Sequence, residues 1–282
     1  MSDMNLAKCQ FTLTVPEGKR LIAKAVAAMP QVRKAMKEGT ILLKGGTTVS
    51  AVSEELCGEA LRISGRVSPR GTVAFGAADL VCPHSIVLRR GAPEPADGRL
   101  AEIAREMGPS DVCVCGANII DIQGNAGMMA GRDLCGEPGS VIPVLLAEGI
   151  FCVIAAGLEK LSPVPIGEAC RQAGRKASAW SMGMAVGLVP IPGRIVTELE
   201  ALSILGFERR WLIGRGGIAG AEGASTFIVE GEESELRKCL ALLQQIKGAE
   251  HSGDESSMPE CLKCGPGGAT HLACSHVRKN KI

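Results

Sequence analysis

The feature that most constrains the fold is a short apolar run followed at once by a glycine pair and a helical pattern. Residues 41–43 are typical of a buried strand, Gly45 and Gly46 come directly after it, and apolar residues recur at helical spacing over 49–61. A longer helical pattern over 18–38, with a break expected at Pro30, precedes the strand. Strand, glycine loop and helix in this order predict the start of a parallel α/β sheet.

The same alternation continues along the chain and then changes in character. Further strands are expected at 72–75, 85–88, 112–115 and 150–156, with a helix at 98–107. After residue 178 the pattern predicts strands at 184–189, 210–213 and 225–230 and helices at 196–205 and 233–246. We therefore expect an α/β domain over 1–177, a small α+β domain over 178–250, and a linker with a Cys/His tail over 251–282.

Charge and aromatic content exclude several classes of function. The chain of 282 residues carries 31 basic and 30 acidic side chains, so it has no net field that would recruit nucleic acid or an anionic membrane. With five Phe, two Trp and no Tyr, it has few side chains on which bases could stack. Specific nucleic-acid binding is therefore not expected.

Cysteine usage and the chain start favour a reducing compartment. The twelve cysteines are too few for a disulfide scaffold, and Met1–Met4 has no signal-peptide features, so we expect a cytoplasmic protein with free thiols. The apolar segment 141–158 approaches the length of a membrane span, but Gly149 divides it. We interpret it as a helix followed by the strand 150–156, and expect no membrane association.

The glycine loop is a candidate anion site. Glycines that follow a strand let the next backbone N–H groups, at a helix N-terminus, point toward a bound anion. The hydroxyls of Thr47 and Thr48 would add donors, and Lys44 or Lys160 would add charge. The alternative is that Thr47 or Thr48 simply caps an ordinary helix.

Two further segments give this loop a context. Residues 111–115 form an expected strand that emerges into Gly116-Ala117-Asn118, and the expected strand at 150–156 is followed by Glu159-Lys160-Leu161. Together with 41–56 they resemble the ribose-5-phosphate isomerase type A family and its relatives, which include glucosamine-6-phosphate deaminases, sugar-phosphate-sensing domains of DeoR-type repressors, and CoA transferases. The resemblance covers about 18–248.

The resemblance implies a fold and a set of site residues. It implies a Rossmann-like parallel sheet with a small lid domain, and a phosphate-binding loop carried here by Gly45, Gly46, Thr47 and Thr48. The counterpart of the family's Asp-Gly-Ala-Asp-Glu motif is the run from Cys115 through Gly116, Ala117 and Asn118 to Ile119.

The departures from the family pattern matter for function. Cys115 and Asn118 stand where the isomerases have aspartates, no lysine occurs between Gly45 and Glu159, and only Glu137 falls where the proton-transferring glutamate would be. Isomerisation needs a base and a group that stabilises the enediolate, so efficient isomerase activity is not expected. Cys115 is either a nucleophile or, with Cys113, a small buried residue of its strand.

Two other groups of residues have alternative interpretations. Arg66, Arg70 and Arg132 either clamp a second anion or are surface charges. In the tail, four residues have spacing suited to tetrahedral zinc: Cys261, Cys264, His271 and Cys274. An unliganded tail or a redox Cys-x-x-Cys pair is the alternative.

The first hypothesis for function is a protein that binds or senses a phosphorylated, sugar-phosphate-like metabolite without turnover. The second is a divergent isomerase or CoA-transferase-like enzyme that uses Glu137 and Cys115. The third makes the zinc tail the site of a protein partner, with the α/β body as its scaffold. We expect no organic cofactor, and a homo-oligomer.

Overall fold

The computed structural model describes residues 6–74, 82–254 and 274, and within them the chain is a mixed α/β protein with eight α-helices. The helices are α1 (Val15–Ala28), α2 (Pro30–Glu38), α3 (Thr47–Cys57), α4 (Leu100–Glu106), α5 (Glu137–Ala147), α6 (Ile166–Gln172), α7 (Glu198–Ile204) and α8 (Glu233–Ile246), with 3₁₀ turns η1 (Asp133–Cys135) and η2 (Leu158–Lys160).

The strands form three larger sheets and one hairpin. They are β1 (Ala7–Leu13), β2 (Thr40–Lys44), β3 (Gly65–Ser68), β4 (Gly71–Ala74), β5 (Ser85–Arg89), β6 (Ala92–Pro95), β7 (Val112–Cys115), β8 (Ile119–Asp121), β9 (Ala126–Ala130), β10 (Phe151–Ala155), β11 (Leu161–Ser162), β12 (Gly187–Ile191), β13 (Arg194–Val196), β14 (Arg209–Gly216) and β15 (Ala224–Gly231).

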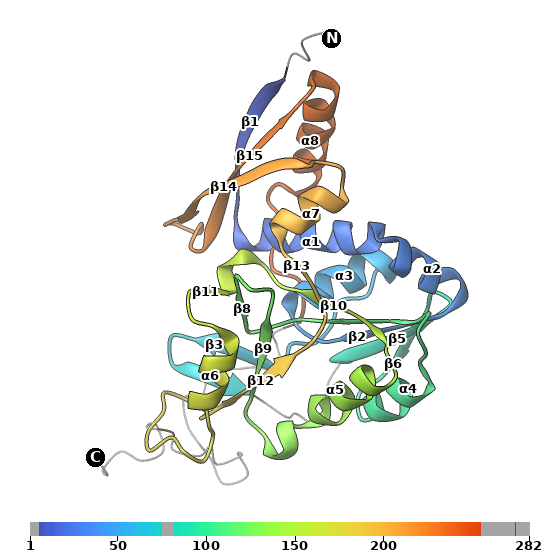
Figure 1. Ribbon diagram of the computed structural model, residues 1–282, viewed down its shortest axis with the longest axis vertical. Coiled ribbons are helices and arrows are strands. Elements are labelled where there is room, and N and C mark those ends of the chain that lie inside the picture. Colours follow the sequence, from blue (N-terminus) through green and yellow to red (C-terminus); the bar gives the residue numbers. More distant parts are fainter. Residues whose placement is uncertain (1–5, 75–81, 255–273, 275–282) are drawn as a thin grey trace.

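The central sheet has six strands in the order β13-β10-β7-β2-β5-β6 (Figure 1). The strands β13, β10, β7 and β2 are parallel to their neighbours in this order, whereas β5 and β6 continue the sheet antiparallel. The parallel order places the carboxyl ends of β2, β7 and β10 side by side. Ligands of open α/β sheets bind at this edge.

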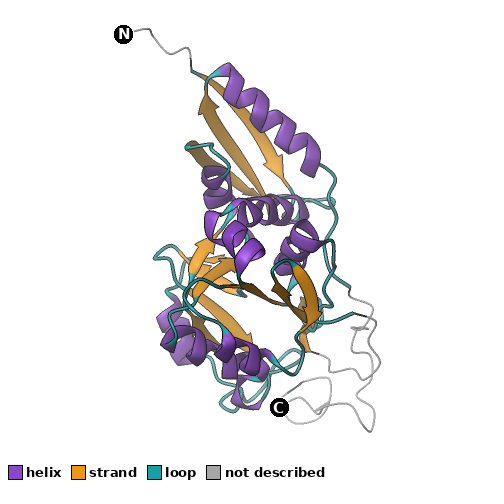
Figure 2. Cartoon of the chain, turned by 90° about the vertical axis from the view of Figure 1, so that its right-hand side faces the viewer, coloured by secondary structure: helices purple, strands orange, loops and turns teal. Residues whose placement is uncertain are grey.

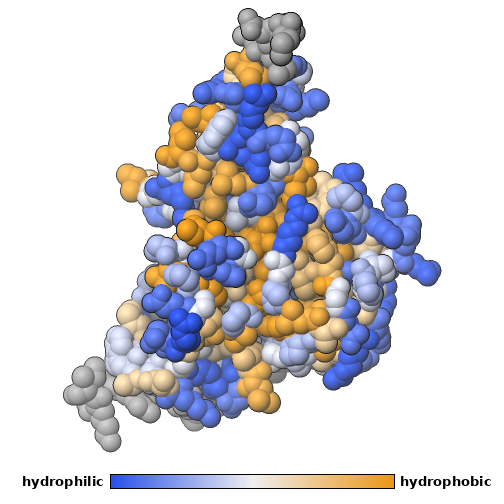
Figure 3. Space-filling model, viewed as in Figure 1, coloured by the Kyte–Doolittle hydropathy of each residue, from blue (hydrophilic) through white to orange (hydrophobic). Residues whose placement is uncertain are grey.

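Helices cover both faces of the central sheet. Ile41 and Leu43 pack with α1, α2 and α3 on one face, while Leu42 packs with α4 and α5 on the other. This alternation follows from the two-residue period of a strand, and burial on both faces explains the continuous apolar run of β2. Figure 3 shows hydrophilic residues gathered over α2, whose outer side faces solvent.

The predicted break at Pro30 is confirmed. Met29 has an extended backbone (φ −59°, ψ 134°), which ends α1, and Pro30 then occupies the first position of α2. Proline suits that position because its missing N–H has no partner there in any helix. At the other end of α1, Thr14 and Glu17 form a reciprocal capping box.

A second sheet joins the two ends of the described chain. The strand β1 pairs antiparallel with β15, which pairs with β14, and α8 lies along one face of these strands (Figure 2). The sequence pattern did not predict β1. By contrast β12 and β13, which follow residue 178, pair with β9 and β10 of the larger body. The pairing therefore differs from the division at 178 that the sequence predicts.

Two predicted strands of the parallel sheet are placed differently by the structure. The segment expected at 72–75 forms β4, which pairs antiparallel with β3 as a separate hairpin. The segment at 85–88 is in the central sheet as β5, but antiparallel to β2. A run of apolar residues predicts burial and does not determine strand direction, which explains both differences.

The apolar segment at 141–158 has the predicted division, with α5 ending at Ala147 and β10 beginning at Phe151. Across the part of the chain that the structure describes, no helix is both long enough and apolar enough to span a bilayer.

Candidate functional site

The N-terminus of α3 opens at the carboxyl end of β2. Gly46 is the N-cap residue with φ +134°, and no side chain among the described residues caps the helix. The interpretation of Thr47 or Thr48 as an ordinary cap is therefore wrong. The N–H groups of the first turn are left for another acceptor, and the positive end of the helix dipole lies behind them.

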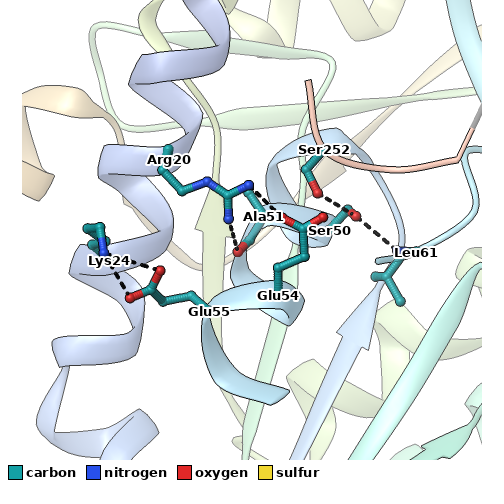
Figure 4. Close-up of polar contacts among 8 residues, drawn as sticks. All are labelled: Arg20, Lys24, Ser50, Ala51, Glu54, Glu55, Leu61 and Ser252. Atoms are coloured by element: carbon teal, nitrogen blue, oxygen red, sulfur yellow. Dashed lines mark hydrogen bonds and ion pairs between the residues drawn. The ribbon is translucent and has the colours of Figure 1, made fainter. Parts of the chain in front are cut away.

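Polar contacts fix α3 against its neighbours (Figure 4). The Arg20 guanidinium of α1 donates to the carbonyl oxygen of Ala51 and to Glu54 at 2.5 Å, and Lys24 pairs with Glu55 at 3.2 Å. Further along, the Ser50 hydroxyl accepts from the backbone N–H of Leu61 and bonds to Ser252. The helix is thus held in place from both sides, so its N-terminus is a preorganised group.

The two threonines of the loop have different surroundings. The Thr47 hydroxyl accepts a hydrogen bond of 2.9 Å from the Lys19 ammonium. The Thr48 side chain is 2% exposed, and its hydroxyl has no hydrogen-bond partner among the described residues. A buried hydroxyl without a partner costs free energy, and such a group in a native structure calls for an explanation.

A cavity of about 520 Å³ lies in front of this helix. It brings together most of the residues that the sequence singles out: Lys44, Gly45, Gly46, Thr47, Thr48, Gly116, Ala117, Asn118, Glu137 and Lys160. The cavity is of the size of small-molecule sites. The residues from Lys44 to Thr48 lie at the end of β2, those from Gly116 to Asn118 follow β7, and Lys160 follows β10, so their convergence results from the parallel order of the sheet. Glu137 reaches the cavity from the start of α5.

The described lining of the cavity carries more positive than negative charge. Its basic side chains are Lys44, Arg62, Arg66, Arg132 and Lys160, and its acidic side chains are Asp97 and Glu137. Arg62 is paired with Asp97 at 3.4 Å. Of the three arginines considered as an anion clamp, Arg66 and Arg132 line the cavity. The remaining excess of positive charge favours an anionic ligand.

Lys160 lies in η2, which contacts β15 of the three-stranded sheet formed by β1, β15 and β14. Burial lowers the pKa of its ammonium, and the nearby carboxylates Glu159 and Glu198 partly oppose this shift. Glu198 is 4% exposed and accepts a 2.8 Å hydrogen bond from the backbone N–H of Leu158. Burial, and next the charge of Glu159, raise the pKa of Glu198 to about 7.

The geometry does not fit Cys115 as a nucleophile. Cys115 lies outside the large cavity, and burial raises the pKa of its thiol to about 11 even though Lys44 opposes the shift. The thiol is therefore protonated at neutral pH, and a protonated thiol is a poor nucleophile. Cys113 is fully buried on the face of the sheet that α4 and α5 cover, as expected for a small residue of a buried strand.

Glu137 and Asn118 both line the cavity and hold backbone in place. The Glu137 carboxylate accepts a 3.1 Å hydrogen bond from the backbone N–H of Leu100, in the first turn of α4. The Asn118 side-chain oxygen accepts a 2.9 Å bond from the backbone N–H of Met129 on β9. Each residue thus has a structural contact, which accounts for its presence without turnover.

Sequence reasoning missed Lys19, Ser64 and His84. Lys19 reaches the loop from α1, and its single signal was a lysine on the largely apolar face of that helix. Ser64 and His84 line the cavity and contact each other at 3.1 Å. They lie twenty residues apart in segments of little periodicity, so no spacing in the sequence connects them.

The predicted zinc ligands Cys261, Cys264 and His271 lie outside the described residues. Cys274 is described and is 1% exposed, and its backbone forms an isolated parallel β-bridge with that of Ser181. Among residues 6–74, 82–254 and 274, no three His, Cys, Asp or Glu side chains form a group that could hold a metal. Four expectations stay predictions: zinc binding by the tail, a protein partner at the tail, a homo-oligomer and a cytoplasmic location.

Comparison of the chain with family models, with curated proteins and with solved structures finds no match. Inferences about its function therefore depend on the geometry of the cavity.

Proposed function

We propose that this protein binds a phosphorylated, sugar-phosphate-like metabolite, with the phosphate seated on the N-terminus of α3. One observation carries the proposal: the α3 N-terminus, which no described side chain caps, opens at a cavity that Thr48 also lines, and the buried Thr48 hydroxyl has no partner among the described residues. A phosphate would accept from both and so satisfy the donors that the protein leaves open. Lys44 and Lys160 on the cavity wall would balance its charge.

We further propose that the body belongs to the ribose-5-phosphate isomerase and CoA-transferase type of Rossmann-like fold, with the sheet of β1, β15 and β14 and its helix α8 as the lid. The parallel core and the loop after β2 support this assignment. Efficient isomerase activity is not part of the proposal, because Cys115 and Asn118 provide no carboxylate where the family has aspartates.

A thermal-shift titration tests the proposal. The ligands are inorganic phosphate, ribose 5-phosphate, glucosamine 6-phosphate and CoA, each added to the native protein. A ligand present at one hundred times its Kd stabilises the folded state by about 2.7 kcal/mol, which raises the midpoint by several degrees. We expect a sugar phosphate to give the largest shift, with a smaller one from phosphate.

Each other outcome has a defined meaning. A shift with CoA alone would favour the transferase-like alternative. No shift with any of the four ligands would contradict the proposal, and the glycine loop would then be structural.

A further inference from the structure

A serine and a histidine meet on the wall of the cavity. The Ser64 hydroxyl lies 3.1 Å from Nε2 of His84, and Nδ1 of the same ring lies 2.8 Å from the carbonyl oxygen of Arg62. A carbonyl oxygen only accepts, so Nδ1 of the neutral ring carries the proton. The lone pair of Nε2 then faces Ser64, whose hydroxyl donates to it.

The histidine is held firmly in this orientation. Its backbone N–H donates to Asp97 at 2.8 Å, and its ring lies so close to Gly45 that a Cβ there would be 2.1 Å from Cε1. Burial lowers the pKa of His84, and the charges of Lys44 and Arg62 lower it further. The hydrogen bond from the ring to the Arg62 carbonyl and the charge of Asp97 oppose this shift. The ring is therefore neutral at pH 7, as a general base must be.

We propose that Ser64 and His84 are a nucleophile and its general base, and that they hydrolyse a carboxylic ester bound in the cavity. A serine hydroxyl is a weak nucleophile until a base accepts its proton, and a neutral imidazole whose other nitrogen is tied to an acceptor is the usual base. Here the backbone carbonyl of Arg62 takes the orienting role. Both side chains line the cavity, so a bound ester has access to them.

The chemistry balances with water as the only co-reactant. In the first step Oγ of Ser64 bonds to the ester carbonyl carbon, its proton passes to Nε2 of His84, and the alcohol leaves with that proton. In the second step water gives a proton to Nε2 and bonds to the acyl carbon, the bond to Oγ breaks, and Oγ recovers the proton. The acid is released and the enzyme is restored.

The substrate class follows from the position of the pair, and this part rests on the proposed function. The ring of His84 contacts the loop at Gly45, next to the α3 N-terminus that would hold a phosphate. We therefore assign the substrate as a carboxylic ester of a phosphorylated metabolite. The nucleophile itself does not depend on the anion site.

The pair is tested on the native full-length chain with an uncharged fluorophosphonate, which transfers its phosphonyl group to an activated serine and releases fluoride. We expect mass spectrometry of the digested protein to find the adduct on Ser64. Ser178, which is similarly half-buried and donates to the carbonyl oxygen of Gly174, is the internal control and should stay unmodified. Ser64→Ala should abolish the adduct, and His84→Gln should slow its formation roughly 100-fold or more.

The pH profile of labelling gives a second readout that a structural histidine would not move. The rate should be constant at neutral pH and fall only below the ordinary histidine pKa of 6.5, because the pKa of His84 is lowered. This profile decides the question if His84→Gln fails to fold by circular dichroism. Unlabelled Ser64 in the wild type, or labelling that is unaffected by His84→Gln and by pH, would overturn the proposal.

Inorganic phosphate separates the two parts of the inference. Protection of Ser64 by phosphate is expected if an anion binds beside the pair. Labelling without protection would overturn the phosphorylated substrate, while the serine and histidine would stand. The proposed function is decided separately by the thermal-shift titration.

Discussion

At the scale of single residues, Thr48 is a buried side chain that the proposed phosphate would contact. Its buried hydroxyl has no partner in the described structure and would gain one from a phosphate. We predict that Thr48→Val stabilises the free protein by about 1 kcal/mol, because a buried partnerless hydroxyl is removed. The same change should weaken phosphate binding about tenfold or more, because a bond to a charged group is lost. Chemical unfolding and calorimetric titration measure the two effects.

Ser85 offers a matched control for this prediction. Its hydroxyl is also buried without a described partner, but it does not line the cavity. Ser85→Ala should leave phosphate binding unchanged. Equal effects of the two variants on binding would contradict the role given to Thr48.

At the scale of elements, the loop between β2 and α3 depends on Gly45. A Cβ at this position would lie 2.1 Å from Cε1 and 2.3 Å from Nδ1 of His84, so the ring or the loop would have to move. We predict that Gly45→Ala destabilises the protein by roughly 1–3 kcal/mol and weakens anion binding. Gly116→Ala is the control, because its Cβ would meet nothing closer than 3.8 Å. The thermal unfolding midpoints of both variants measure the loss of stability. Equal midpoints for Gly45→Ala and Gly116→Ala would contradict the close contact between Gly45 and His84.

The elements also show what a sequence can predict here and what it cannot. The loop 45–48, the run 116–118 and Lys160 could be placed at one site, because each follows a buried strand whose pattern is strong and parallel strands end at one edge. The antiparallel direction of β5 could not be predicted, since an apolar run is the same in both directions. Nor could Ser64 and His84, whose meeting depends on tertiary packing of two weakly patterned segments.

At the scale of the whole molecule, Glu198 lies on α7, which contacts β13 of the central sheet and β14 of the three-stranded sheet. It begins α7, contacts the chain at Leu158, and lies close to Gly18 of α1. The pKa of this group is about 7 when folded and 4.5 in an ordinary setting, so the folded state holds a proton that the unfolded state has lost. The contribution of Glu198 to stability must therefore fall as pH rises from about 4.5 to 7.

We predict that Glu198→Gln removes this part of the pH dependence. Relative to the wild type, the variant should gain on the order of 3 kcal/mol of stability between the acid and the neutral end of that range. Glu148→Gln, at an exposed glutamate after α5, should leave the profile unchanged. Urea unfolding at a series of pH values measures the difference, and parallel curves for wild type and Glu198→Gln would contradict it.

The chain as a whole is also predicted to carry one zinc ion in its tail. Metal analysis of the native protein should find about one zinc per chain, and Cys261→Ser should lose it because a tetrahedral site needs all four ligands. Cys170→Ser, at a half-buried cysteine of α6, should retain it. A chain without zinc, or a Cys261→Ser variant that keeps it, would contradict this prediction.

The central claim is that a phosphate sits on the N-terminus of α3, and amide NMR measures this most directly. Titration of the ¹⁵N-labelled protein with ribose 5-phosphate should shift the backbone amides of Thr47, Thr48 and Val49 most strongly, because their N–H groups would donate to the phosphate. In Thr48→Val the same amides should respond only at higher concentrations. Saturable shifts confined to other parts of the chain, or no shifts at all, would contradict the claim.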